Sequence, residues 1–129
     1  MAGTTPSPLR VVVADNDRDA RDLIEIDLGL EGHDVVGAAP DGAGAVELCR
    51  LLHPDVLVVD LRMPPGPDGV AVARELRDQP GLRVVLYTNY RNGEVAAAAE
   101  QVGATYLLKG DLRALRAAVL PRPRQPVTE

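Results

Sequence analysis

The stretch VVVADNDRDA, residues 11–20, carries four small or branched apolar residues directly into two carboxylates with an amide between them. A near-continuous apolar run is typical of a parallel strand that is buried on both faces. Polar residues directly after such a strand are expected at the carboxyl end of the sheet, where open α/β folds bind their ligands. The stretch therefore predicts a buried strand that ends at a polar site.

Similar aliphatic runs recur along the chain and alternate with helical patterns. Strands are predicted at residues 10–15, 34–39, 56–60, 83–88 and 106–109. Helices are predicted at residues 18–32, 41–52, 68–79, 92–103 and 110–120. Strict alternation favours a doubly wound, flavodoxin-like α/β fold, with five parallel strands in the order 2-1-3-4-5 and helices on both faces.

Several residues carry more local predictions. The core-facing side of the first helix is predicted from its apolar residues, Ala20, Leu23, Ile24, Leu28 and Leu30. Gly32 is expected to end that helix, and Asp17, Asp41 and Asp68 are expected to cap helix N-termini. The single Cys49 lies at a position that predicts core packing, so we do not expect a reactive thiol.

The composition fits one small domain. The chain has 129 residues, 46% of them hydrophobic, with no Phe or Trp, so its core must be aliphatic. A formal charge of −5 disfavours a nucleic-acid surface, which depends on clustered Lys and Arg. The chain has no signal-peptide pattern and no apolar run of membrane-spanning length, so we expect a cytoplasmic protein without membrane contact. We expect the domain at residues 10–120, after a flexible tail at 1–9 and before a Pro-rich tail or linker at 121–129.

Polar side chains follow four of the predicted strands. Asp15 and Asp60 end neighbouring central strands, Thr88 ends the next, and Lys109 ends the last. In the predicted strand order these side chains share one crevice. Two carboxylates repel each other, and Mg²⁺, which prefers oxygen ligands, would neutralise them. A carboxylate beside Mg²⁺ can accept a phosphoryl group, whose oxygens a hydroxyl and an ammonium can bind.

Four motifs occur in order at these strand ends: VVVADND, VLVVDLRMP, VVLYTNY and GATYLLKG. Together they resemble the receiver domain of bacterial two-component response regulators, and the resemblance covers residues 10–120. It implies that Asp60 accepts a phosphoryl group from a sensor histidine kinase and that the domain then switches a protein-interaction face. A downstream protein or a C-terminal output domain would read this face, with homodimerisation a further possibility. The only chemistry implied is self-directed phosphotransfer and dephosphorylation, so an enzyme acting on other substrates is not expected.

The resemblance also implies a metal site. Asp15, Asp60 and the backbone carbonyl of Arg62 would hold Mg²⁺. Asn16 stands where the family usually has a second acidic residue, and its amide offers an oxygen without a formal charge. Asp17 is better placed as a helix cap than as a replacement ligand. The open alternative is a degenerate receiver that acts by protein contact without phosphorylation.

By the same resemblance, Thr88 and Lys109 contact the phosphoryl group, and Tyr106 reports it to the outer face. Arg62 and Tyr90 lie two positions beyond Asp60 and Thr88, where family side chains flank the approach of hydrolytic water. A guanidinium can lie on a phenol ring, so the pair is predicted to cover the site and lengthen phosphoryl lifetime. A small Mg²⁺-dependent phosphatase and a flavodoxin-like cofactor carrier are weaker alternatives, because no second catalytic acid and no Ser/Thr-rich phosphate loop is evident.

Overall fold

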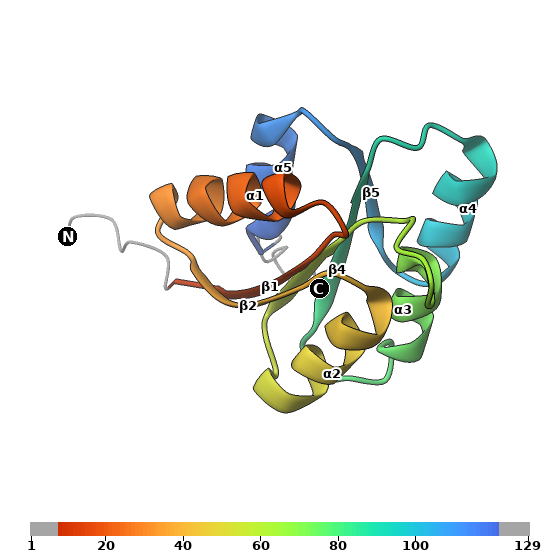
Figure 1. Ribbon diagram of the computed structural model, residues 1–129, viewed down its shortest axis with the longest axis horizontal. Helices are drawn as coiled ribbons and strands as arrows, with labels where there is room; N and C mark the ends of the chain where they lie inside the picture. The colour runs from red at the N-terminus through yellow and green to blue at the C-terminus, as the bar shows by residue number, and fades with distance from the viewer. Residues whose placement is uncertain (1–7, 122–129) are drawn as a thin grey trace, which may run out of the picture.

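A five-stranded parallel sheet runs through the middle of the computed structural model, which describes residues 8–121 (Figure 1). Its strands are β1 (Arg10–Ala14), β2 (Asp34–Ala39), β3 (Val56–Val59), β4 (Arg83–Thr88) and β5 (Thr105–Leu108). They pair in the order β2-β1-β3-β4-β5, and every pairing is parallel. The predicted fold class and strand order are confirmed.

Helices cover both faces of the sheet. They are α1 (Arg18–Leu30), α2 (Gly42–Leu52), α3 (Gly69–Glu75), α4 (Gly93–Gln101) and α5 (Leu112–Val119). Helices α1 and α5 pack on one face, and α2, α3 and α4 pack on the other (Figure 1). The predicted caps are confirmed, because the carboxylates of Asp17, Asp41 and Asp68 each accept a hydrogen bond from a backbone N–H in the first turn of a helix.

The central strand explains why the apolar runs do not alternate. In β3, Val56 and Val58 face α1 and α5, while Leu57 and Val59 face the other three helices, and all four are buried. A strand buried on both faces needs apolar residues at every position. Cys49 is buried, as predicted, on the face of the sheet that α2, α3 and α4 cover. Burial raises the pKa of its thiol to about 12.

The prediction that Leu23 and Leu30 of α1 face the core is wrong. Leu23 and Leu30 are 52% and 81% exposed, whereas Ile24 and Leu28 are buried. At about 100° per residue, Leu23 and Leu30 lie about 100° or more around the helix from Ile24 and so point past the sheet. Gly32 follows the helix with φ of +89°, which confirms it as the residue that turns the chain away.

Helix α3 ends four residues earlier than predicted, at Glu75 rather than residue 79. The N–H of Gln79 donates to the carbonyl of Leu76, three residues back, so the last turn is tighter than an α-helix. Pro80 follows, and the residue before a proline disfavours helical dihedrals. The buried Gln79 amide donates to the carbonyl of Cys49 at 2.8 Å and so ties this turn to α2.

Strands β1, β3 and β5 each end one residue before the predicted polar residue. Asp15, Asp60 and Lys109 therefore lie just beyond the sheet, where their side chains are free to converge. The predicted tails fall almost entirely outside the described residues. Within residues 8–121, no helix is both long and apolar enough to span a bilayer.

Candidate functional site

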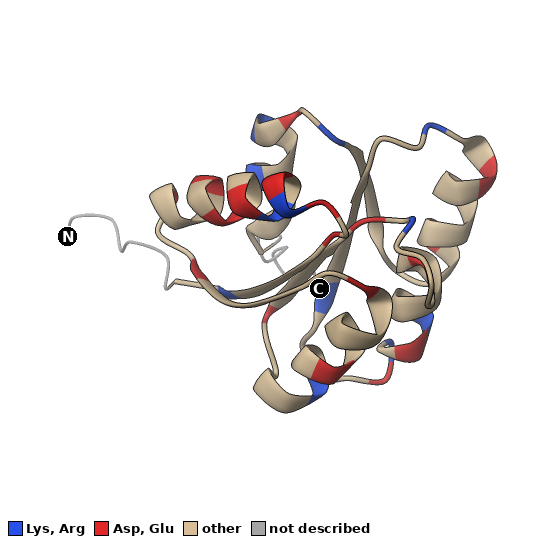
Figure 2. Cartoon of the chain, viewed as in Figure 1, with Lys and Arg blue, Asp and Glu red and all other residues tan. Residues whose placement is uncertain are grey.

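The ends of β1 and β3 bring two carboxylates side by side. Ala14 pairs with Val59 in the sheet, and the N–H of Asp60 donates to the carbonyl of Ala14 at 2.9 Å. The next residues, Asp15 and Asp60, therefore emerge together at the carboxyl edge, where Figure 2 shows acidic residues. Their side chains are 2% and 12% exposed, so the two charges lie in a largely water-excluded place.

Lys109 bridges the two acids. Its ammonium nitrogen lies 2.6 Å from Oδ2 of Asp15 and 3.0 Å from Oδ2 of Asp60. Burial disfavours the charged ammonium, but hydrogen bonds to both carboxylates outweigh it, and the pKa of Lys109 lies above its ordinary value. The sequence predicted these residues in one crevice but not this double contact. Strand β5 is two strands from β3, roughly 10 Å away, and the long lysine stem spans that distance.

Backbone groups hold the remaining carboxylate oxygens. Oδ1 of Asp15 accepts from the N–H of Asp17 at 2.9 Å, and Oδ1 of Asp60 accepts from the N–H of Leu61 at 2.7 Å. The Arg21 guanidinium donates to the carbonyl of Asp15 at 2.7 Å. The sequence interpretation missed Arg21, because an arginine in the first turn of a helix gives no signal of this contact. These bonds fix both acids in orientation.

The donor set suits a weakly held Mg²⁺ ion. Asp15 and Asp60 offer hard oxygen ligands with further lone pairs, and Mg²⁺ commonly keeps several waters. Asn16 is exposed after β1, and the carboxylate of Asp17 accepts from the N–H of Asp19, so neither adds a third charge. Among the described residues, no group of three His, Cys, Asp or Glu side chains is placed to hold a metal ion.

A cavity of about 200 Å³ opens beside the phosphoacceptor candidate, lined by Asp60, Arg62, Thr88, Asn89 and Tyr90. The guanidinium carbon of Arg62 lies 4.3 Å from the centre of the Tyr90 ring. The expected stacking of this pair is therefore present, while its effect on phosphoryl lifetime stays a prediction. The stacked pair therefore forms part of the wall of this cavity.

Thr88 and Tyr106 meet at the backbone of Tyr90. The hydroxyl oxygen of Thr88 accepts from the N–H of Tyr90 at 3.2 Å, which leaves the hydroxyl proton available for another acceptor. The hydroxyl of Tyr106 donates to the carbonyl of Tyr90 at 2.5 Å. Thr88 is buried and Tyr106 is half-buried, so both predicted side chains lie on the inner side of this loop.

A further residue supports the turn after Lys109. The hydroxyl of the buried Tyr87 accepts from the N–H of Gly110 at 2.9 Å, and Gly110 has φ of +99°. This bond holds the backbone that positions the lysine. The sequence interpretation treated Tyr87 as part of an aliphatic strand, because nothing in the run VVLYT marks a hydrogen-bonding role.

Comparison with known proteins gives a consistent result. A family profile described as a response regulator receiver domain matches residues 11–120. The chain is 42% identical over 108 residues to a protein-glutamate methylesterase/protein-glutamine glutaminase of Myxococcus xanthus, covering 81% of this chain and 31% of that protein. It is 36% identical over 104 residues to the transcriptional regulatory protein PdtaR of Mycobacterium tuberculosis, covering 79% of this chain and 50% of that protein.

Solved structures agree with these matches. The signal receiver domain of NarL from Mycobacterium tuberculosis superposes with a TM-score of 0.80 at 35% identity, covering 88% of this chain and 98% of that one. The response regulator domain of CheB from Thermotoga maritima gives a TM-score of 0.75 at 25% identity, covering 90% of this chain and 99% of that one. The chain spans half or less of the two curated relatives but nearly all of these isolated domains.

Proposed function

Since the chain belongs to the family of response regulator receiver domains, we propose that Asp60 accepts a phosphoryl group from a sensor histidine kinase in the bacterial cytoplasm. The observation that carries this proposal is the Lys109 bridge between Asp60 and Asp15, next to the cavity that Thr88 lines. Proteins of this family mostly act as signalling modules. A downstream protein or a C-terminal output domain would read the change.

The arrangement of these side chains supports such a transfer. A carboxylate oxygen of Asp60 attacks the phosphorus of a phosphohistidine, the P–N bond breaks, and the imidazole nitrogen leaves with the electron pair and takes up a proton. Lys109 stays paired with Asp15 and can donate to a phosphoryl oxygen in place of its contact with Asp60. The Thr88 hydroxyl, which accepts from Tyr90, can still donate its own hydrogen to a second phosphoryl oxygen.

Receiver domains are generally Mg²⁺-dependent, and a bound Mg²⁺ would neutralise charge on the phosphoryl oxygens. We propose Asp15, Asp60, the backbone carbonyl of Arg62 and the amide oxygen of Asn16 as its ligands. Because Asn16 is uncharged, replacing it with Asp should tighten Mg²⁺ binding about tenfold, an energy of about 1.4 kcal/mol. Isothermal titration of both forms measures this. As a control, Gln101→Glu adds the same charge at the exposed end of α4 and should leave the affinity for Mg²⁺ unchanged. Equal Mg²⁺ affinity of Asn16→Asp and the native chain would contradict the proposal that residue 16 is a metal ligand.

A degenerate receiver that works without phosphorylation is the second candidate. Two observations favour it: Asn16 withholds one charge, and Lys109 already pairs with both carboxylates. In such a protein the site would be a fixed structural ion cluster, and binding to a partner would not depend on a phosphodonor. The same residues thus support two modes that one experiment separates.

Treatment with acetyl phosphate and Mg²⁺, followed by a Phos-tag gel, tests the leading proposal. A shifted band in the native chain that is lost in Asp60→Asn is expected. Asp41→Asn is the matched control, because Asp41 caps α2 and asparagine caps a helix as well as aspartate does. If no shifted band forms with this donor or with a phosphorylated histidine kinase, the degenerate alternative is the correct one.

The lifetime of the phosphoryl group depends in this proposal on Arg62 and Tyr90. Their stack lines the cavity beside Asp60, so we expect water to reach the phosphorus less often than in the Arg62→Ala, Tyr90→Ala double variant. We expect at least a severalfold faster loss of phosphorylated protein in the double variant, measured after donor removal with Mg²⁺ present. An unchanged or slower decay would show that the stack does not shield the site.

A further inference from the structure

Tyr90, in the loop between β4 and α4, is held from three directions. Its ring lies under the guanidinium of Arg62, 4.3 Å from the guanidinium carbon. Its N–H donates to Thr88 at 3.2 Å, and its carbonyl accepts from the hydroxyl of Tyr106 at 2.5 Å. The three partners come from the loop after β3, from β4 and from β5. One residue therefore joins three segments that are distant in sequence.

The backbone of Tyr90 is hydrogen-bonded on both sides of its side chain, by its N–H to Thr88 and by its carbonyl to Tyr106. The N–H bond to Thr88 makes a tight turn at the end of β4, so the backbone at Tyr90 has few alternatives that keep its ring in place. The ring also packs against the core cluster beneath α3 and α4. When Arg62 stacks on the ring, the ring is held between the guanidinium and the core. We expect this to restrict the direction of the Tyr90 carbonyl, which accepts the hydrogen bond from Tyr106.

Arg62 is free to act on this ring. Its side chain is exposed, and among residues 8–121 it takes part in no ion pair. The phenol ring is thus the defined contact of its guanidinium. A cation–π contact at an exposed site changes a conformational ratio by about two- to fivefold, which is enough to bias a side chain between two positions.

We infer that Arg62 is a positioning residue for Tyr106: by stacking on Tyr90, it keeps the acceptor carbonyl in place and so holds Tyr106 inward before any phosphoryl group is attached. The inference goes beyond the proposed phosphotransfer, because it concerns the unphosphorylated chain. Arg62 follows Asp60 by two residues, whereas Tyr106 lies on β5, two strands from β3 in the sheet. The Arg62 stack therefore links the loop of the phosphoacceptor to the surface formed by β5 and α4.

The chain suits a direct measurement of this link. It has three tyrosines, Tyr87, Tyr90 and Tyr106, and no Trp or Phe. The full chain labelled with 3-fluorotyrosine should give three ¹⁹F NMR signals, which single Tyr→Phe variants assign. The change of each signal between H₂O and D₂O reports the solvent exposure of its ring. No phosphodonor is added, so failure of phosphorylation has no bearing on the result.

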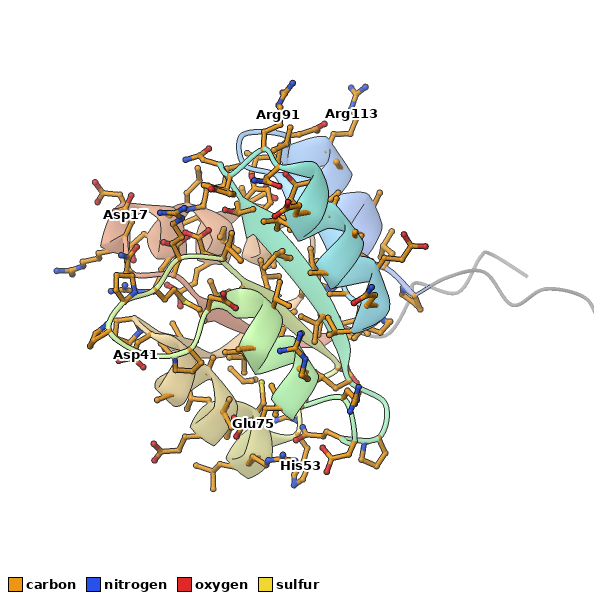
Figure 3. The ribbon with its side chains drawn as sticks, turned by 90° about the vertical axis from the view of Figure 1, so that its right-hand side faces the viewer. Asp17, Asp41, His53, Glu75, Arg91 and Arg113 are labelled. Atoms are coloured by element: carbon orange, nitrogen blue, oxygen red, sulfur yellow. The ribbon has the colours of Figure 1, made fainter. Side chains whose placement is uncertain are left out.

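In Arg62→Ala we expect two signals to move. Tyr90 loses its stack, and Tyr106 shows a larger solvent isotope shift, because its outward population rises about two- to fivefold. The buried Tyr87 should keep its native signal. Arg91→Ala is the matched control, since Arg91 belongs to the same loop and points away from the domain (Figure 3). It removes the same charge and should leave Tyr106 unchanged.

The remaining outcomes decide against the inference or are resolved by one more variant. Movement of Tyr90 without Tyr106 would break the proposed link, and no movement of either would exclude the stack in solution. If Arg91→Ala changes the Tyr106 signal as much as Arg62→Ala does, the change comes from the lost positive charge and not from the stack. If Tyr87 also moves, Arg62→Lys decides, because it keeps the cation: return of Tyr106 to its native signal supports the link, and a persistent displacement overturns it.

Discussion

Lys109 pairs with both carboxylates of the site, so removing it should increase the repulsion between them. In Lys109→Met, Asp15 and Asp60 remain largely buried without their shared partner, and the free energy of unfolding should fall by about 3–5 kcal/mol. Because Mg²⁺ can replace the lost charge, it should stabilise this variant more than the native chain. Urea unfolding with and without Mg²⁺ measures both effects.

The control for this experiment is Arg113→Met, which removes one positive charge from an exposed position on α5 (Figure 3). Its stability should change by less than about 0.5 kcal/mol, and its response to Mg²⁺ should match that of the native chain. Equal Mg²⁺ stabilisation of Lys109→Met and the native chain would mean that the two acids do not form the metal site.

For the individual residues of the site, the sequence predicted which side chains lie together but not which hydrogen bonds and ion pairs they form. Asp15, Asp60, Thr88 and Lys109 were predicted together, because parallel strands bring their carboxyl ends to one edge. The double contact of Lys109 depends on the path of a flexible side chain across β4, which residue spacing does not specify. The hydroxyl bond from Tyr106 to the Tyr90 carbonyl likewise depends on a loop conformation rather than on strand position.

The start of α3 is pressed against the backbone of the phosphoacceptor candidate. A Cβ atom at Gly69 would lie 2.3 Å from the carbonyl oxygen of Asp60 and 2.5 Å from Cδ1 of Leu86. Gly69→Ala should therefore destabilise the fold by about 1–3 kcal/mol and displace Asp60. Thermal and urea unfolding measure the first effect, and phosphorylation by acetyl phosphate reports the second.

Gly66, in the loop just before α3, offers a matched comparison. A Cβ atom there would meet nothing within 4 Å, so Gly66→Ala should change stability by less than about 0.5 kcal/mol. Similar losses in the two variants would show that α3 moves to accommodate a side chain and that the close approach to Asp60 is not required.

The starts of α1, α2 and α3 were predicted correctly, because the pattern that marks them is local. Helix starts followed from capping side chains such as Asp41, whose hydrogen bond lies within a few residues. The outward positions of Leu23 and Leu30 depend on the angle at which α1 meets the sheet, whereas α3 ends early because of the tight turn before Pro80. Apolar content alone does not determine that angle, since exposed leucines are common in folded proteins.

Across the whole molecule, one ion pair connects the two helices on the same face of the sheet. The buried Asp27 of α1 pairs with Arg116 of α5, with Oδ1 and Nη2 2.5 Å apart, although the residues are 89 positions apart in sequence. In Arg116→Met the Asp27 charge would stay buried without a partner, so stability should fall. The double variant Asp27→Leu, Arg116→Met should recover most of the loss, because it removes the unpaired charge.

A double-mutant cycle by urea unfolding measures this coupling. The control cycle uses Arg18 and Asp22, whose nitrogen and oxygen lie 3.9 Å apart on an exposed face of α1 and should show almost no coupling. Additive losses at Asp27 and Arg116 would mean that the two helices are held by apolar packing alone. The sequence could not predict this pair, because a buried aspartate in α1 does not indicate which distant arginine meets it.

Lys109 is the single lysine of the 129-residue chain, so selective labelling chemistry can follow the site. Acyl reagents that modify amines have one side-chain target here besides the N-terminal amine. They react with the neutral amine, and the raised pKa of Lys109 together with its two carboxylate partners makes that form scarce. The rate of acylation at Lys109, read by mass spectrometry, thus becomes a reporter of every event that removes one of those partners.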